Sequence, residues 1–202
     1  MEPIESKRTA VLLLHFQNDI AHENGKMGFG GGAKRANVVN AAQRLASAAR
    51  VARIPVVHVR VAYRYDYTDT VANCKLFERV CGERALLEGE WGSRFVDDMQ
   101  PLEGEYIVTH RRVNPFYGSM LQEVLDRNEV RTAIISGVAT NYVVEHAARH
   151  ASDIGYRTIV ASDACSSSSI EAHEASLRSM DLIAEIRNVA EIERALPLAA
   201  PI

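Results

Sequence analysis

The sequence predicts an α/β fold in which helices cover both faces of a parallel β-sheet. Two observations carry this prediction. Apolar runs of strand length alternate with amphipathic segments of helix length, and the strand-length runs are apolar almost throughout. Continuous apolar strands are typical of parallel sheets, because helices bury both of their faces. We therefore expect a three-layer αβα architecture.

Six segments have the length and apolar character of buried strands. They are Ala10–Leu14 (AVLLL), Pro55–Val61 (PVVHVRV), Tyr106–Thr109 (YIVT), Thr132–Ser136 (TAIIS), Thr158–Ala161 (TIVA) and Leu182–Ile186 (LIAEI). Their number predicts a parallel sheet of about six strands.

Five segments between and after these strands have the spacing of apolar residues expected of helices. They are Ala33–Ala52, Tyr117–Arg127, Asn141–Ser152, Glu171–Met180 and Val189–Leu196. Because no repeat, linker or low-complexity block divides the chain, we expect a single domain over residues 1–202.

Two segments break the alternation. Gly25–Gly32 (GKMGFGGG) is rich in glycine, but Ala33 and Lys34 follow it where a phosphate-binding loop needs Lys and then Ser or Thr, so we interpret it as a flexible lid or loop. Tyr63–Arg94 is a long polar connection that contains Tyr63, Tyr65, Tyr67 and Trp91, and we interpret it as a functional lid, packing or a subunit contact.

Composition excludes several classes of function. A net charge of -3 over 202 residues gives no electrostatic attraction to nucleic acid or anionic membranes. The first ten residues, MEPIESKRTA, lack the apolar core of a signal peptide, and no apolar run reaches membrane-spanning length. The three cysteines form no CxxC pair, so we expect reduced thiols and a cytoplasmic protein.

Polar side chains follow several of the predicted strands. His15 and Asp19 follow the first, His110 and Arg112 the third, and Asn141 the fourth. In open α/β sheets, ligands bind outside the carboxyl ends of the strands, where such side chains meet. The sequence therefore predicts a polar pocket there for a small molecule.

Four separated stretches resemble the isochorismatase-like hydrolases, also called the cysteine hydrolase superfamily. They are LLLHFQNDI, THRRVNPFYGSML, ISGVATNYVVEHAAR and ASDACSSSSIEAHEASLRSM. The resemblance covers nearly the whole chain. It implies a Rossmann-like parallel sheet, a homo-oligomer to which the long connection contributes, and, in the amidase members, catalysis by an aspartate, a lysine and a cysteine.

The resemblance places all three of these catalytic positions on other residue types. The aspartate, two positions before QND, falls on His15. The lysine, six residues before a phenylalanine, falls on His110, and the cysteine, six positions after the glycine of GVAT, falls on Val143. The frame is therefore present with a degenerate triad, and a cysteine amidase is excluded because valine is not a nucleophile.

Backbone groups of the site can keep their role although the three catalytic side chains are replaced. The family bends at the Val-Ala step of GVAT, often through a cis peptide, and the resemblance implies an oxyanion hole made by the amides of Ala139 and Val143. Metal-binding members use an aspartate and histidines at positions that fall near Val61 and Tyr63 here, so we expect no metal at that place. No other cofactor is expected.

Several side chains have both a functional and a purely structural interpretation. We expect Arg112 to hold a substrate carboxylate through its planar fork, and Asn114, Asn141 and Phe16 to contact the substrate. Glu145 lies two residues after Val143 in a predicted helix, and a rotation of one residue along that helix decides whether its side chain points toward the pocket.

Other candidates have simpler explanations. We expect Asp19 to organise its loop, Cys165 to be a buried structural thiol and His58 to be a core histidine. His146 and His150 have i, i+4 spacing but no HExxH arrangement, so a helix face is the simpler interpretation. Cys74 and Cys81 are incidental thiols of the polar connection.

Three functions stay open on the sequence alone. The first is hydrolysis of a small vinyl ether, amide or ester without a covalent intermediate, with His15 and His110 as acid and base. The second is a catalytically silent pseudoenzyme that binds a small ligand. The third is metal-assisted chemistry at the two histidines, which needs a third ligand from Asp19 or Glu145.

Overall fold

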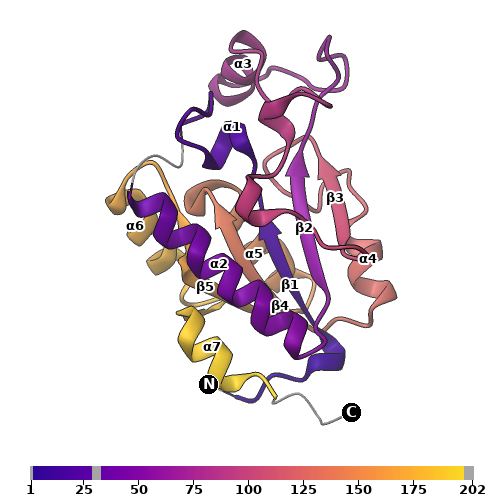
Figure 1. The fold of residues 1–202 in the computed structure, drawn as a ribbon, viewed down its shortest axis with the longest axis vertical. Helices are drawn as coiled ribbons and strands as arrows, with labels where there is room; N and C mark the ends of the chain where they lie inside the picture. The colour runs from indigo at the N-terminus through magenta and orange to yellow at the C-terminus, as the bar shows by residue number, and fades with distance from the viewer. Residues whose placement is uncertain (1, 29–32, 198–202) are drawn as a thin grey trace.

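The computed structural model describes residues 2–28 and 33–197 and contains one six-stranded sheet (Figure 1). All five strand pairs are parallel, and the strand order is β3-β2-β1-β4-β5-β6. The strands are β1 (Thr9–Leu14), β2 (Val56–Val61), β3 (Tyr106–His110), β4 (Thr132–Val138), β5 (Arg157–Ser166) and β6 (Glu185–Arg187). The predicted α/β class and parallel sheet are confirmed.

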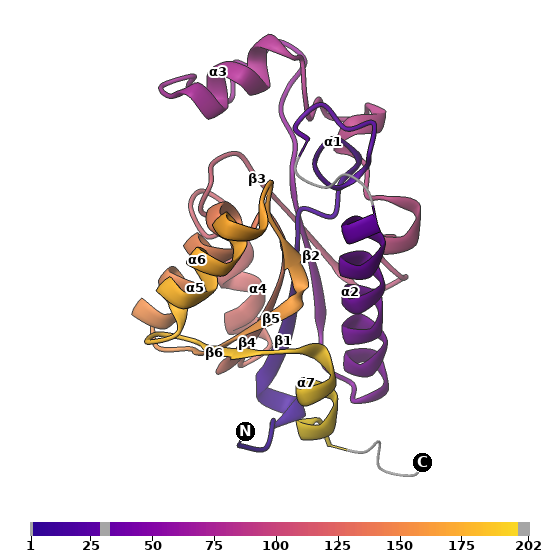
Figure 2. The same cartoon turned by 90° about the vertical axis from the view of Figure 1, so that its left-hand side faces the viewer.

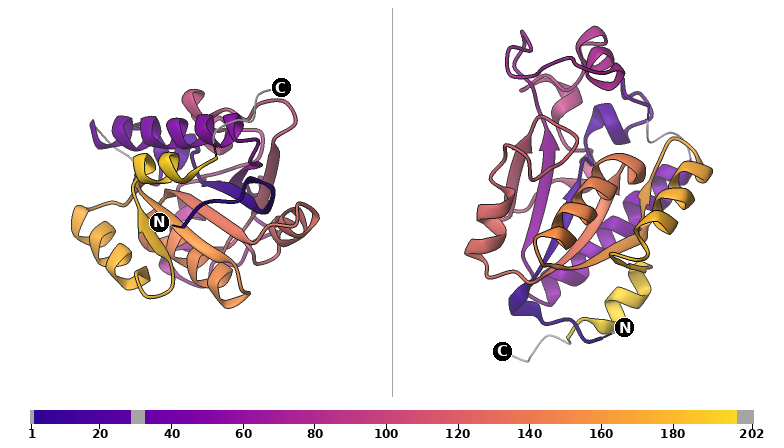
Figure 3. Two further views of the ribbon diagram at one scale, coloured as in Figure 1. Left: turned by 90° about the horizontal axis from the view of Figure 1, so that it is seen from below. Right: turned by 180° about the vertical axis from the view of Figure 1, so that it is seen from behind.

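Helices cover both faces of the sheet, as the sequence predicts. Seen along the edge of the sheet, α2 and α7 lie on one face and α4, α5 and α6 on the other (Figures 2 and 3). The helices are α1 (Asn18–Ala21), α2 (Ala33–Val51), α3 (Lys75–Gly82), α4 (Leu121–Arg127), α5 (Glu145–Asp153), α6 (Ile170–Met180) and α7 (Val189–Ala195). Within the described residues, no helix is long and apolar enough to cross a membrane.

The central strand β1 shows why the strand sequences are apolar throughout. All six of its residues are buried. Because successive side chains point to opposite faces, Val11 and Leu13 join the core beneath α2 and α7, and Leu12 and Leu14 join the core beneath α4 and α5. Because both faces of β1 are buried, the residues that point to either face need apolar side chains.

Several element boundaries differ from the predictions, among them the end of β5, which lies at Ser166 instead of Ala161. The last strand begins at Glu185 because Leu182 lies in the preceding turn, where its side chain is 97% exposed. Helix α4 begins at Leu121, since Asn114 and Ser119 accept hydrogen bonds from the backbone N–H groups of Phe116 and Leu121 and so stabilise a loop before it.

After β4, a single π-helical turn over Thr140–Val144 precedes α5, so the predicted helix from Asn141 is two elements. Such π turns inside helices frequently mark functional sites. Here it follows directly on the carboxyl end of a central strand.

Helix α3 and the short helix α1 lie above the carboxyl ends of the strands (Figure 1). In the long connection after β2, the short helix α3 forms and Tyr65, Val71 and Trp91 are exposed. Exposed side chains of this size are what a subunit contact needs, and the homo-oligomer stays a prediction. Of the predicted Gly25–Gly32 loop, residues 29–32 lie outside the described residues.

Gly137 on β4 tests how closely the two central strands must approach. It pairs with Leu14 on β1, and a Cβ atom at position 137 would lie 2.4 Å from the Leu14 carbonyl oxygen. We expect Gly137→Ala to lower the free energy of unfolding by roughly 1–3 kcal/mol, the usual cost of overpacking, in denaturant titrations. Gly82→Ala is the matched control, because nothing lies within 4 Å of its added Cβ. Equal stability of the two variants would contradict the explanation.

Candidate functional site

Two histidines stand at the carboxyl ends of β1 and β3. His15 directly follows β1, where its positive φ of 60° turns the chain while its backbone N–H still donates to the carbonyl of Val59. His110 is the last residue of β3 and pairs with Val61 on β2. Because β2 lies between β1 and β3, the two imidazoles meet across the end of that middle strand.

The two imidazoles form a hydrogen-bonded pair. Nε2 of His15 lies 2.6 Å from Nε2 of His110, and the nearly parallel rings have centroids 4.8 Å apart. His110 is fully buried, and His15 is 7% exposed. Only one of these two nitrogens can carry the shared proton in a neutral pair, so one ring donates and the other accepts.

Burial keeps this pair neutral near physiological pH. Desolvation lowers the pKa of His15 well below its usual range, and the neighbouring His110 lowers it further. Desolvation also lowers the pKa of His110, to about 4. The nearby backbone of Asn114 and Arg112 raises the His110 pKa in part, although Nδ1 makes no hydrogen bond of normal geometry to any described residue.

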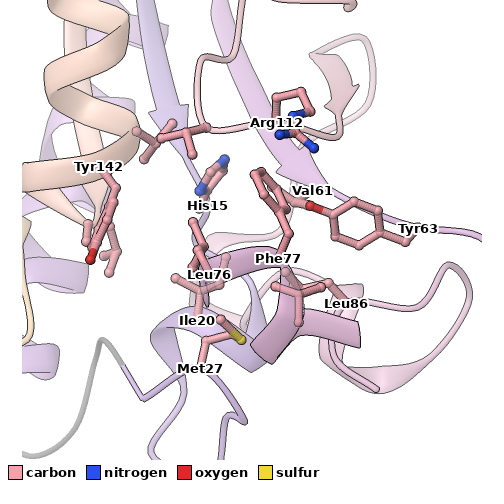
Figure 4. Close-up of a pocket in the computed structure, with 15 residues that line it drawn as sticks. His15, Ile20, Met27, Val61, Tyr63, Leu76, Phe77, Leu86, Arg112 and Tyr142 are labelled. Carbon is pink, nitrogen blue, oxygen red and sulfur yellow. The ribbon is translucent and has the colours of Figure 1, made fainter. Parts of the chain in front are cut away.

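His15 opens onto a small, mostly apolar pocket of about 60 Å³, which has room for a few water molecules or a small ligand (Figure 4). The described residues that line it are His15, Ile20, Met27, Val61, Tyr63, Leu76, Phe77, Val80, Leu86, Arg112, Val113, Val138, Ala139, Tyr142 and Val143. The expected backbone positions Ala139 and Val143 therefore lie at the pocket, and the Val138–Ala139 peptide is cis.

A buried carboxylate organises the segments above this pocket. Asp19, which is 1% exposed, accepts hydrogen bonds from the backbone N–H of Leu86 at 2.7 Å and of Lys26 at 3.4 Å. Leu86 and Met27, the neighbour of Lys26, both line the pocket. These contacts support the loop-organising role expected of Asp19.

Gln17 holds neighbouring segments of the site together through hydrogen bonds. Its fully buried side chain donates to the carbonyls of Val61 and Ser93 and accepts from the Val61 N–H. One side chain thereby joins the segment after β1 to the end of β2 and to the turn Trp91–Ser93.

Arg112 lines the pocket, but its guanidinium is bound within the protein. It donates to the carbonyl of Val71 at 2.9 Å and to Oδ1 of Asn73 at 2.7 Å, and it lies 3.7 Å from the centre of the Phe77 ring. Arg112 therefore joins the strand-end loop to α3. Its expected role in holding a substrate carboxylate stays a prediction.

The other expected substrate contacts lie outside the pocket lining. Phe16 is fully buried in the core. Asn114 contacts Nδ1 of His150 at 3.1 Å, and Asn141 accepts a hydrogen bond from Ser167. Glu145 is bound to Ser176 and Arg149 on the helices.

The sequence analysis did not predict that α3 forms a wall of the pocket. Leu76, Phe77 and Val80 all line the pocket from this helix. The signal was present, because these positions lie on one face of a helix, whereas the segment was interpreted as a polar connection.

The site geometry leaves little room for a metal ion between the two histidines. A zinc ion bound at 2.0–2.1 Å from each nitrogen needs more than the 2.6 Å that separates them at any ordinary tetrahedral angle. The two expected third ligands, Asp19 and Glu145, are bound elsewhere. No group of three or more His, Cys, Asp or Glu residues that could hold a metal occurs within the described residues.

His58, His150 and Cys165 have structural surroundings. His58 is buried and contacts Glu105 at 2.9 Å, and His150 stacks on Phe116. Cys165 is buried as expected, and desolvation raises its pKa to about 12, so it is an unreactive thiol.

Comparison with known proteins identifies the family. The model of the isochorismatase domain matches residues 9–191 of this chain. The chain belongs to the isochorismatase family. This confirms the resemblance to the isochorismatase-like hydrolases found in the sequence.

Similar proteins in this family include both uncharacterised members and hydrolases. An uncharacterised isochorismatase family protein, YecD, from Escherichia coli O157:H7 is 31% identical over 97% of this chain and 100% of its own length. The ureidoacrylate amidohydrolase RutB of Agrobacterium fabrum is 28% identical over 81% of this chain and 78% of its own.

Solved structures show the same fold over nearly the whole chain. The crystal structure of a cysteine hydrolase from Pseudomonas syringae pv. phaseolicola 1448A has a TM-score of 0.90 at 25% identity, and the match covers 99% of this chain and 97% of that one.

We expect His15 and His110 to remain neutral at pH 6, well below the point where an ordinary histidine is half protonated. Burial lowers both pKa values, and proton uptake by one ring opposes uptake by the other, so the pair titrates as a unit. Nitrogen-15 NMR of the imidazoles between pH 4 and 8 measures this directly. Protonation of either ring with a midpoint near 6.5 would contradict it.

Proposed function

We propose that this protein hydrolyses a small carbonyl compound, an ester or an amide, without a covalent intermediate. His15 acts as the general base and His110 holds it in position. The supporting observation is the pair itself: the imidazole of His15, which lines the pocket, is hydrogen-bonded at 2.6 Å to the fully buried imidazole of His110. The resemblance found in the sequence implies that Val143 stands in place of the family nucleophile, so the proposal has water attack the substrate directly.

The proposal needs one arrangement of protons on the two rings. We assign the proton of His110 to its Nδ1, because one of the two Nε2 atoms that face each other at 2.6 Å must be the acceptor. Nε2 of His110 then accepts the hydrogen bond from Nε2–H of His15. This arrangement leaves Nδ1 of His15 unprotonated and able to accept a proton.

Hydrolysis then needs one proton transfer in each direction. The oxygen of water bonds to the substrate carbonyl carbon while its proton passes to Nδ1 of His15. The nearby carbonyl of Val138 stabilises the protonated ring, since it raises the His15 pKa. Breakdown of the tetrahedral intermediate returns that proton to the leaving oxygen or nitrogen, which gives an acid and an alcohol or amine.

Backbone amides at the end of β4 complete this proposal. Charge develops on the carbonyl oxygen during water attack, and Ala139 and Val143 both line the pocket. Their N–H groups are the proposed oxyanion hole, a device that needs no particular side chain. Substitution of the catalytic side chains therefore leaves this component in place.

Lowered pKa values favour carbonyl substrates over vinyl ethers. Cleavage of a vinyl ether begins with protonation, so it needs a group that carries an acidic proton at the working pH. His15 and His110 are held neutral by burial, which suits a base better than an acid.

Ligand binding without turnover is the second candidate function. The observation that favours it is the pocket lining, which is apolar apart from a few side chains. A neutral histidine pair in such a pocket also serves as a hydrogen-bonding partner for a bound molecule. Wild-type protein that binds small carbonyl compounds but hydrolyses none of a broad panel of esters, amides and vinyl ethers would establish this candidate instead.

We expect His15→Ala to lower kcat/KM on a responsive ester or amide by about 10²-fold or more, the usual scale for loss of a general base. Loss of the base affects the chemical step, so kcat should fall while thermal unfolding stays cooperative. In wild-type protein, kcat/KM should be constant near neutral pH and fall on acidification, because protonation removes the base.

His146→Ala is the matched control, since His146 is exposed on α5 and does not line the pocket. Its turnover should equal that of wild type. Undiminished turnover in His15→Ala would rule out the catalytic role of His15.

Turnover should also be independent of thiols. We expect the exposed Cys74 to react with iodoacetamide and the buried Cys165 to resist it, with kcat unchanged after complete modification of accessible thiols. Mass spectrometry identifies the modified residues, and activity is measured on the same sample. Inactivation in proportion to the modification of one cysteine, with the fold intact, would contradict hydrolysis by direct water attack.

A further inference from the structure

We propose that the pocket binds a small monocarboxylate with an apolar body, which Arg112 holds at its carboxylate and α3 contacts along its body. For the reaction, this inference rests on the proposed function and makes the substrate an ester or amide that also carries one free carboxylate. For binding, it stands on the contacts of the pocket alone.

Arg112 gives the pocket a positive charge. Among the described residues that line the pocket, it is the permanently charged side chain. Burial holds His15 neutral by lowering its pKa, and burial raises the pKa of Tyr63, so that hydroxyl stays protonated near neutral pH. An ionised ligand therefore meets a cation at this wall and no anion from these two side chains.

The Arg112 guanidinium contacts neutral groups. It donates to the carbonyl of Val71 at 2.9 Å and to Oδ1 of Asn73 at 2.7 Å, and Oγ1 of Thr70 lies 3.5 Å away. Its remaining contact is with the Phe77 ring. These three acceptors use at most three of the five N–H groups of a guanidinium, so at least two remain for a ligand.

The acidic side chains of this region are bound to other groups. The carboxylate of Asp69 accepts from Nε of the neighbouring Arg111 and forms an ion pair with it. Asp19 accepts from backbone N–H groups and does not line the pocket. Arg111 is therefore neutralised within the protein, whereas the charge of Arg112 is left for a ligand.

The contacts of Arg112 also fix its position before a ligand arrives. Val71 and Asn73 bind its terminal nitrogens, and its central carbon lies 3.7 Å from the centre of the Phe77 ring. Ordering a free arginine costs rotamer entropy, and here that ordering has already occurred. A carboxylate therefore gains charge-assisted hydrogen bonds to a preorganised cation.

The rest of the wall selects the body of the ligand. Leu76, Phe77 and Val80 face the pocket from α3, and Ile20 and Met27 face it from the segment after β1 (Figure 4). The pocket volume of about 60 Å³ keeps this body small. A second carboxylate would lose its hydration against these apolar side chains without a second cation to bind it. The pocket therefore favours one carboxylate over two and over none.

Three probes of matched shape measure this selection without any turnover. Isobutyrate and isobutyramide differ in charge, and methylmalonate is isobutyrate with one methyl group replaced by a second carboxylate. Binding to the full chain at pH 7.5 is followed by NMR chemical-shift titration. Isobutyrate should bind about tenfold or more tightly than either other probe, which corresponds to roughly 1.4 kcal/mol. Equal or tighter binding of isobutyramide or methylmalonate, or no saturable binding of isobutyrate, would overturn the proposal.

Arg112→Met tests the assignment of the carboxylate to Arg112. Methionine keeps an apolar stem but removes the charge, so isobutyrate affinity should fall about tenfold or more, with a smaller change for isobutyramide. Arg112→Lys keeps the charge without the planar fork and should have intermediate affinity. Arg178→Met is the matched control, because Arg178 is exposed on α6 and does not line the pocket. Undiminished isobutyrate affinity in Arg112→Met would refute the role of Arg112.

Leu76→Glu tests the same charge without altering Arg112, whose contacts also hold α3. Leu76 is only partly buried, so a glutamate there places a negative charge at the pocket without burying it in the core. The preference for isobutyrate over isobutyramide should disappear, because like charges repel and the glutamate can occupy Arg112 itself. Leu182→Glu is the matched control, since Leu182 is almost fully exposed and does not line the pocket. A preference that persists in Leu76→Glu would place the binding elsewhere.

The reaction separates this inference from the proposed function. N-acetylglycine carries one carboxylate and should be hydrolysed with a higher kcat/KM than N-acetylglycinamide. If the proposed function fails, isobutyrate still binds selectively, in wild type and in His15→Ala, while no ester or amide is hydrolysed. If the present inference fails, esters and amides are hydrolysed without preference for a carboxylate, and Arg112→Met does not change isobutyrate binding.

Discussion

The buried carboxylate of Asp19 holds the pocket together. Its two oxygens accept backbone hydrogen bonds from segments that are far apart in the sequence, at Lys26 and Leu86. Gly92 packs against the same carboxylate so closely that a Cβ atom there would lie 2.0 Å from Oδ2. The loop after α1 and the long connection after β2 therefore converge on one side chain, and the walls formed by Met27 and Leu86 depend on that convergence.

The electrostatic character of the site follows from which groups are absent at the strand ends. The resemblance found in the sequence implies an aspartate and a lysine at the positions of His15 and His110. In the structure the two histidines form a neutral pair, because burial suppresses protonation of both rings. This pair lies beside an apolar wall and beside Arg112, the permanently charged side chain among the described residues that line the pocket.

The sequence was sufficient for the sheet, most helices and the two histidines, because each depends on local pattern or on the family frame. Apolar runs identified every strand, including the central β1. Arg112 could not be assigned in the same way, since its partners Val71 and Asn73 lie about forty residues earlier in the chain. The pocket wall of α3 was missed for a related reason: its apolar face, Leu76, Phe77 and Val80, is short and surrounded by polar residues.

The strand order also has a consequence for biosynthesis. β1 lies between β2, which follows it in the chain, and β4, which begins more than a hundred residues later. A growing chain can pair β1 with β2 and β2 with β3 early, but the other edge of β1 stays unpaired until β4 has left the ribosome. During that interval, an apolar strand edge is available to other chains, and unpaired edges promote aggregation. Slow translation between β3 and β4 would lengthen this exposure, whereas chaperones that cover strand edges would be most useful there.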